Sequence, residues 1–276
     1  MKSIKHSFLF MNIIIVMMVV LITGCDSLIS PTGPADPFSD VELAAKTASG
    51  ATLHAILVVD TNAGDLTKAL RADLNNMNTL IDTITTHTGL GLNKLVYSGG
   101  NATTANVQHA ISTLAAGPDD VIIFYHSGHG GRTSKTASQW PNMYFKGDPG
   151  LIGMNLYDVF ALLTSKGSRL VLVMSDTCNS SIEVSQQAFS SQGAYLSGSE
   201  AGYQKLFLES RAAIIASSSV PGELSYAYPE GSVFTKQFLR ALSRELSRSN
   251  PNWSSVMESA THQIAGVRQH PQYVMH

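Results

Sequence analysis

Short apolar runs alternate with amphipathic stretches along most of this chain. Three runs are dominated by apolar residues: LHAILVVD (53–60), DVIIFYHS (120–127) and RLVLVMSD (169–176). The first of them is typical of a parallel strand that is covered on both faces. Residues 65–86, between the first two runs, carry Leu, Met and Ile at helical spacing. This alternation predicts an α/β fold with a mainly parallel central sheet and helices on both faces.

The remaining sequence completes one domain. Further strands are predicted at residues 92–98 and 212–219, and further helices at residues 104–115, 156–163, 234–246 and 254–267. The chain has no internal repeat and no long low-complexity tract. We therefore expect a single domain over residues 51–276.

The segment before this domain has the features of a bacterial lipoprotein leader. Lys2 and Lys5 precede an apolar run at residues 8–22, and the segment ends in LITGC. A basic start, a short apolar core and small residues before the cut describe a secretory signal, and this one resembles a lipobox. Residues 1–25 are therefore expected to be a lipoprotein signal peptide with Cys25 lipidated. The alternatives are an uncleaved anchor and a plain secretory peptide.

Residues 26–50 form a polar segment without apolar periodicity, rich in Ser, Pro, Gly, Asp and Ala, and are expected to be a flexible tether. Two or three acyl chains hold a protein on a membrane, because each buried methylene contributes about 0.8 kcal/mol. The expected location is the bacterial cell envelope, lipid-anchored and facing outward from the cytoplasm. In a Gram-negative cell this is the periplasmic side of the inner membrane.

Composition and charge exclude one class of partner. The chain has 276 residues, 44% hydrophobic and 14% charged, with a formal net charge of -2, as is ordinary for a globular protein. Nucleic-acid binding needs clustered Lys and Arg. The densest basic stretch, Arg240, Arg244 and Arg248, has the spacing of a solvated helix face. No nucleic-acid partner is therefore expected.

Two unusual polar stretches follow consecutive core strands: HSGHGG (126–131) and SDTCNSS (175–181). In open α/β sheets, sites form just beyond the carboxyl ends of the strands, so these loops are expected to lie side by side. Cys178 is the only cysteine besides Cys25. With Cys25 lipidated, it has no intramolecular disulfide partner. In an oxidising compartment such a thiol is expected to be either buried and inert or reactive.

His129 and Cys178 have the chemistry of a base and a nucleophile. A free thiol is mostly protonated at neutral pH, and an imidazole is suited to take or hold its proton. The backbone N–H groups of Gly130 and Cys178 are suited to stabilise an oxyanion. The plain alternatives are a small buried cysteine and a structural histidine.

Two other kinds of site fit the sequence less well. His126 and His129 are three residues apart, but no HExxH motif and no nearby carboxylate cluster completes a metal site. No G-x-S-x-G serine elbow occurs. Neither a metal nor a cofactor is therefore expected.

At these residues the chain resembles the caspase-like cysteine peptidases, most closely the metacaspase and bacterial caspase-domain branch. FYHSGHG is similar to that branch's Y-S-G-H-G, and SDTCNSS is similar to its D-x-C-x-S-G. VFTKQFLRAL (233–242) and RQHPQY (268–273) are similar to two further segments of the family. The resemblance spans residues 51–274. It implies a His129–Cys178 dyad, with Gly130 and the Cys178 backbone as the oxyanion hole.

The resemblance also implies a specificity. Caspases proper read aspartate with basic residues, whereas metacaspases read arginine or lysine with acidic ones. The positions of the metacaspase pocket fall on Asp73, Ser127 and Asp176, so cleavage after Arg or Lys is expected. The plain alternatives are a solvated helix residue for Asp73 and a turn former for Asp176.

The chain departs from the metacaspase pattern in two places. The loop after the histidine is usually acidic and linked to calcium, but here residues 131–150 contain Asp148 as their only carboxylate. Calcium activation is therefore not supported by the sequence. Asn179 and Ser181 replace the usual His and Gly after the cysteine, which concerns the local turn rather than the nucleophile.

The sequence leaves the natural substrate, the activation step and the oligomeric state open. The resulting hypothesis is a membrane-tethered cysteine endopeptidase that cleaves a peptide or protein substrate through a thioester resolved by water. A transpeptidase would use the same dyad and resolve the thioester with an amine. The alternative from another class is a catalytically inactive caspase-like module that binds peptides or proteins.

Overall fold

The computed structural model describes residues 44–46, 50–150, 153–181, 196–263 and 266–276. The predicted signal peptide, Cys25 and most of the predicted tether lie outside these residues. No helix in the described part of the chain is long and apolar enough to cross a membrane.

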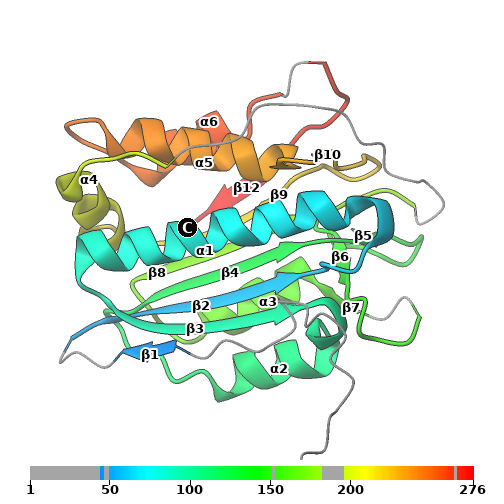
Figure 1. Cartoon of the computed structure of the whole chain (residues 1–276), viewed down its shortest axis with the longest axis horizontal. Helices are drawn as coiled ribbons and strands as arrows, with labels where there is room; N and C mark the ends of the chain where they lie inside the picture. The colour runs from blue at the N-terminus through cyan, green and yellow to red at the C-terminus, as the bar shows by residue number, and fades with distance from the viewer. Residues whose placement is uncertain (1–43, 47–49, 151–152, 182–195, 264–265) are drawn as a thin grey trace, which may run out of the picture. The chain divides into compact units, whose positions relative to one another are not determined.

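A seven-stranded sheet forms the centre of the domain (Figure 1). Its strands are β1 (Ala44–Lys46), β2 (Thr52–Val59), β3 (Gly91–Ser98), β4 (Val121–Ser127), β8 (Leu170–Asp176), β9 (Ala212–Ser217) and β12 (Gln272–Met275). They lie in the order β1-β3-β2-β4-β8-β9-β12. The strands from β3 to β9 run parallel, and β1 and β12 pair antiparallel at the two edges.

Helices cover both faces of this sheet (Figure 1). They are α1 (Thr67–Thr88), α2 (Thr104–Thr113), α3 (Leu156–Thr164), α4 (Glu200–Gln204), which continues into the π-helical turn η3 (Lys205–Glu209), α5 (Val233–Leu246) and α6 (Trp253–Ala260). One core joins α1, α4, α5 and α6 to the sheet, and a second core joins α2 and α3 to the opposite face. The predicted fold class is therefore confirmed.

The alternation of side chains along the central strands explains the two cores. Every residue of β4 and β8 is buried. Leu172 packs in the core under α1 and α5, whereas its neighbour Val173 packs in the core under α2 and α3. Successive side chains of a strand point to opposite faces, so a wholly apolar strand is buried on both.

Two small sheets stand apart from the central one. The first is formed by β5 (Gly130–Gly131), β6 (Asn142–Tyr144) and β7 (Gly153–Asn155), and the second by β10 (Ala227–Tyr228) and β11 (Gly231–Ser232). Strand β5 follows the carboxyl end of β4 after only two residues. It therefore carries the chain directly across the end of the sheet where a site is expected.

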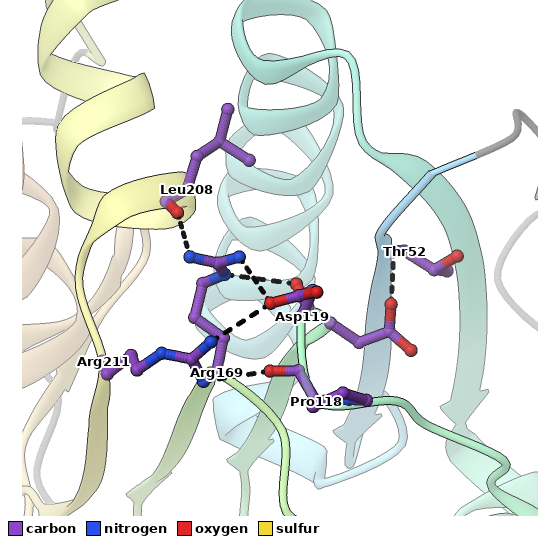
Figure 2. A network of polar contacts seen from close by, with 7 residues as sticks. Thr52, Pro118, Asp119, Arg169, Leu208 and Arg211 are labelled. Carbon is purple, nitrogen blue, oxygen red and sulfur yellow. Dashed lines mark hydrogen bonds and ion pairs between the residues drawn. The ribbon is translucent and has the colours of Figure 1, made fainter.

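A network of polar contacts joins segments at the opposite, amino-terminal end of the strands (Figure 2). Arg169, just before β8, donates to the carbonyl oxygens of Asp119 and Leu208 and to the Asp119 carboxylate. Arg211, just before β9, donates to the same carboxylate at 3.1 Å and to the Pro118 carbonyl oxygen. These contacts connect the chain entering three parallel strands and lie far along the sheet from the two polar loops.

The boundaries of the main elements agree with the sequence pattern, with one clear error. The last helix ends at Ala260 rather than at residue 267. The side-chain amide of Gln237 donates to the carbonyl oxygens of Ala260 and His262, at 2.9 and 2.7 Å. The Ala260 carbonyl is among the groups that a helix end leaves without a partner, and a side chain of α5 satisfies it and the His262 carbonyl just beyond the helix. Also, β1 lies within the segment that the sequence indicated as a tether.

Replacing one buried leucine tests the sheet core. Leu172→Ala is expected to lower the free energy of unfolding by about 2–5 kcal/mol, because the side chain is 0% exposed and leaves a cavity. Leu162→Ala is the matched control: Leu162 lies on α3, is 48% exposed, and should change the value by less than about 0.5 kcal/mol. Urea unfolding of both variants measures this, and an equal loss in both would contradict the packing described.

Candidate active site

The two polar loops run side by side beyond the sheet. The last residues of β4 and β8, Ser127 and Asp176, are paired in register. Beyond them, the Gly128 N–H donates to the Asp176 carbonyl oxygen at 3.3 Å. The loops pair again further on, where the Arg132 N–H donates to the Ser180 carbonyl oxygen at 2.8 Å.

This pairing keeps one constant offset along the two loops. The Thr177 hydroxyl donates to the Gly128 carbonyl oxygen at 2.8 Å, across 49 positions of sequence. The same offset relates the strand ends and the parallel bridge between Arg132 and Ser181. His129 and Cys178 have this offset as well, so the paired loops place the two residues opposite each other.

Cys178 is buried at the start of the turn after β8. It is 5% exposed and is the only cysteine among the described residues, where it forms no disulfide. The backbone N–H of Ser225 donates to its Sγ atom at 3.4 Å. The Cys178 thiol donates in turn to the Ser225 carbonyl oxygen at 4.0 Å, so the backbone of Ser225 contacts the sulfur both as donor and as acceptor.

His129 lies at the mouth of the site, with 46% of its side chain exposed. Its Nε2 atom is 4.0 Å from Oδ2 of Asp60, whose side chain is only 2% exposed. Burial raises the pKa of the Asp60 carboxyl, while the positive charge that His129 can carry opposes this rise. The sequence had indicated Asp60 only as the last residue of a strand.

Gly130 fits a position that excludes a side chain. A Cβ atom there would lie 2.3 Å from the Thr177 hydroxyl oxygen and 2.6 Å from the Asn142 carbonyl oxygen. The Tyr144 N–H donates to the His129 carbonyl oxygen at 3.0 Å, so the carbonyl group of His129 points toward β6. Backbone groups alternate in direction along a strand, and the Gly130 N–H therefore points away from β6, toward the Cys178 turn.

Asp73, on α1, lies fully buried beneath these loops. Its Oδ2 atom accepts hydrogen bonds from the hydroxyls of Ser127 at 2.7 Å and Ser232 at 2.5 Å. Its Oδ1 atom accepts the Ser232 N–H at 2.7 Å. The structure therefore excludes the interpretation of Asp73 as a solvated helix residue.

Asp176 is a second buried carboxylate, two residues before Cys178. It accepts the Ser225 hydroxyl at 2.6 Å and both the N–H and the hydroxyl of Thr235 at 2.8 Å. Ser225 thus contacts both the Cys178 sulfur and the Asp176 carboxylate. The structure brings together all three residues of the predicted acidic pocket, Asp73, Ser127 and Asp176.

The two carboxylates oppose each other's ionisation. Burial and then the negative charge of Asp176 raise the pKa of Asp73 to about 7. Burial also raises the pKa of Asp176, against the hydrogen bonds from Ser225 and Thr235. A positive charge placed between the two groups would favour the ionised form of both.

Several residues of this pocket were missed at the level of sequence. Ser225 and Ser232 carry no motif and lie far along the chain from their partners. Thr235 and Gln269, in contrast, fall within the two segments VFTKQFLRAL and RQHPQY. Gln269 is 0% exposed; its side chain accepts the Tyr226 N–H at 3.0 Å and donates to the Ser218 carbonyl oxygen at 3.0 Å.

His126 points into the core rather than into the site. Its Nδ1 atom lies 2.9 Å from the Ser175 hydroxyl oxygen, and burial lowers its pKa to about 3, so the ring is neutral at pH 7. Nowhere in the described ranges do three or more His, Cys, Asp or Glu side chains form a group that could hold a metal ion.

Comparisons with known proteins agree with this architecture. The sequence profile of the caspase domain matches residues 54–276. The structure is similar to the crystal structure of protein GSU0716 from Geobacter sulfurreducens, with a TM-score of 0.53 and 18% identity over 81% of this chain and 93% of that one. That likeness concerns the fold. No curated protein matches the chain. On the match to the caspase domain over most of its length, this chain belongs to the caspase-domain family.

Proposed function

We propose that this chain is a cysteine endopeptidase that cleaves peptides after Arg or Lys with His129 and Cys178 as its catalytic dyad. One observation supports the proposal: the register of β4 and β8 continues into the two loops and gives His129 and Cys178 corresponding positions, and Ser225 connects Cys178 with Asp176, which acts electrostatically on the buried Asp73. The first feature supports acyl transfer, and the second supports the choice of a cationic side chain.

The reaction begins with transfer of the Cys178 proton to His129. The thiolate attacks the carbonyl carbon of the scissile bond, and the oxyanion is stabilised by the N–H groups of Gly130 and Cys178. His129 returns the proton to the leaving amine as the C–N bond breaks, which leaves a thioester on Cys178. Water, deprotonated by His129, then hydrolyses the thioester and regenerates the thiol.

Specificity follows from the charge of the pocket. Asp73 and Asp176 are buried, and their mutual repulsion favours a shared proton in the empty site. The guanidinium of Arg or the ammonium of Lys would displace that proton and form ion pairs with both carboxylates. An aspartate side chain would add a third negative charge and is disfavoured.

The lipoprotein assignment stands beside this proposal and rests on the sequence alone. Cys25 and its lipobox support attachment to the bacterial envelope with the caspase domain facing outward from the cytoplasm. Mass spectrometry of the mature N-terminus tests it: a diacylated cysteine supports it, and an unmodified chain that starts at Met1 contradicts it.

Removal of the thiol tests whether the chain is an enzyme. Cys178→Ala in the full chain is expected to abolish hydrolysis of peptides with Arg or Lys at the cleavage position, because no other group can form the thioester. Ser181→Ala, in the same turn but with an exposed side chain, should retain activity. Hydrolysis at the parental rate in Cys178→Ala would contradict the role of Cys178, and the absence of hydrolysis in both proteins would favour the inactive binding module. Peptide amides formed with an added amine, in preference to acids, would favour the transpeptidase.

A peptide library tests the acidic pocket. The full chain should cleave peptides after Arg or Lys and not after Asp, with no requirement for added calcium. Asp73→Asn is expected to raise KM for an Arg peptide about 10-fold or more, because the cation loses a buried ionic partner. Asp82→Asn is the matched control on the same helix, with a carboxylate that is 60% exposed. Cleavage after Asp, or an unchanged KM in Asp73→Asn, would contradict the assignment.

The raised pKa of Asp73 predicts a pH dependence of stability. The folded protein holds this proton more tightly than the unfolded chain, so the contribution is fully present below pH about 4 and is lost as the pH rises through about 7. The free energy of unfolding of the parent, minus that of Asp73→Asn, should therefore decrease as the pH rises from about 4 to about 7. Urea unfolding at pH 4.5 and pH 8 (roughly the two ends of the window) measures this, and a constant difference would contradict the buried, protonated carboxyl.

A further inference from the structure

Asp60 is a buried carboxylate that the proposed dyad does not use. It follows the last residue of β2, and its backbone N–H donates to the Ser127 carbonyl oxygen at 3.0 Å. This bond continues the pairing between β2 and β4 by one residue. Asp60 is therefore fixed at the carboxyl end of β2, next to β4, and His129 follows β4 by two residues.

Only one of the two carboxylate oxygens of Asp60 has a hydrogen-bond partner among the described residues. Oδ1 accepts the Asn62 N–H at 3.3 Å. Oδ2 is buried and has no hydrogen-bond partner among the described residues. A buried carboxylate oxygen without a partner is costly, and native proteins retain such groups mainly where they have a use.

The imidazole of His129 is the group that Oδ2 faces. Their separation from Nε2 is 4.0 Å, which is longer than a hydrogen bond. Hydrogen bonds of catalytic groups are often long in unliganded sites and shorten when substrate is bound. The turn between them is closely packed, since a Cβ atom on Gly128 would lie 2.9 Å from the Asp60 Cβ. Little movement of the histidine side chain is needed to close the gap.

We propose that Asp60 is a positioning residue for His129: its Oδ2 atom accepts the Nε2–H of the imidazole, leaves Nδ1 to exchange the proton of Cys178, and stabilises the imidazolium. This inference rests on the proposed role of His129 as the base. It makes the site a Cys–His–Asp arrangement in which the carboxylate is shielded from solvent.

The other charged and titratable groups around this pair do not compete for it. His126, on β4 and three residues before His129, is neutral at pH 7 because burial lowers its pKa to about 3. Lys146, after β6, is exposed and acts on Asp60 only through its charge, which favours the ionised carboxylate. Burial opposes that ionisation and raises the pKa of Asp60. The ionised carboxylate is therefore stabilised most when His129 becomes positively charged. That is the state in which Cys178 is a thiolate.

Two readouts on the full chain test the proposal. The first is kcat and KM for an Arg peptide in the parent and in Asp60→Asn, which keeps the shape of the side chain and removes its charge. The second is the rate at which iodoacetamide alkylates Cys178 between pH 5 and pH 10 (roughly spanning histidine and thiol titration), counted on the Cys178 peptide by mass spectrometry. The second needs no peptide hydrolysis, so it separates the failure of this inference from the failure of the proposed function.

We expect Asp60→Asn to lower kcat about 10- to 100-fold with little change in KM. The pH of half-maximal alkylation should rise by about one unit, because the thiolate loses a stabilised imidazolium partner. Asp120→Asn is the matched control, since Asp120 pairs with His54 at 3.2 Å at the opposite end of the same sheet. It should leave both readouts as in the parent.

An unchanged kcat and an unchanged alkylation profile in Asp60→Asn would overturn the proposal. A lowered melting temperature with an unchanged alkylation profile would overturn it as well, since Asp60 would then be structural. The proposal expects the reverse, because Asp60→Asn removes a buried charge and should melt at the parental temperature or above it. Asp60→Ala provides the same comparison if Asp60→Asn does not fold.

Discussion

The parallel pairing of β4 with β8 is the constraint on which the candidate site depends. Both strands are buried on both faces, and a slip of one residue would send every side chain to the wrong core. The contact between the His126 ring and the Ser175 hydroxyl, at 2.9 Å, lies within this ladder and fits one register only. Because the loops keep that register beyond the strands, the core decides which residues of the two loops meet.

Burial acts on the acids of this site in two different ways. Asp73 and Asp176 are close enough to repel each other, and hydroxyl and N–H donors compensate for only part of the cost of burying them. Asp60 is separate from that pair and faces His129, which in the proposed mechanism is the base and becomes cationic. In both places the protein holds a buried carboxylate that a further positive charge would stabilise: in the proposed mechanism this is the substrate cation, added to the charge of Lys236, beside Asp73 and Asp176, and protonated His129 beside Asp60. Such groups lower stability, and their concentration at one end of the sheet is typical of a functional site.

The sequence could predict the features that repeat or that follow a strand. Long apolar runs indicated β2, β4 and β8, and the rule for strand ends indicated that the His129 and Cys178 loops meet. Strands such as β5 and β10, of two residues each, are too short to show a period and were missed. The hydrogen bonds of Ser232 to Asp73 span 159 positions of sequence, and no local pattern reports them. Asp60 was missed because, at the end of an apolar run, it has the same appearance as an ordinary strand terminus.

Asn179, one of the two residues after the cysteine that depart from the metacaspase pattern, connects the loops around the site. Its Oδ1 atom accepts the Arg132 guanidinium at 2.9 Å, and its Nδ2 group donates to the carbonyl oxygens of Gln139 and Ser219. Its backbone N–H donates to the Glu223 carbonyl oxygen at 2.9 Å. One side chain, next to Cys178, therefore joins the loop after β5 to the loop after β9.

In the proposed enzyme, the loop after β9 links the substrate pocket to the thiol. The loop after β9 also supplies Ser225, which contacts both the Cys178 sulfur and the Asp176 carboxylate. In the proposed enzyme, a substrate cation beside Asp176 would therefore act on a residue whose N–H donates to the Cys178 sulfur, while Asn179 holds the turn that carries Cys178. The charge of the pocket and the orientation of the thiol are thus linked through one short loop, and a substitution in that loop should change both together.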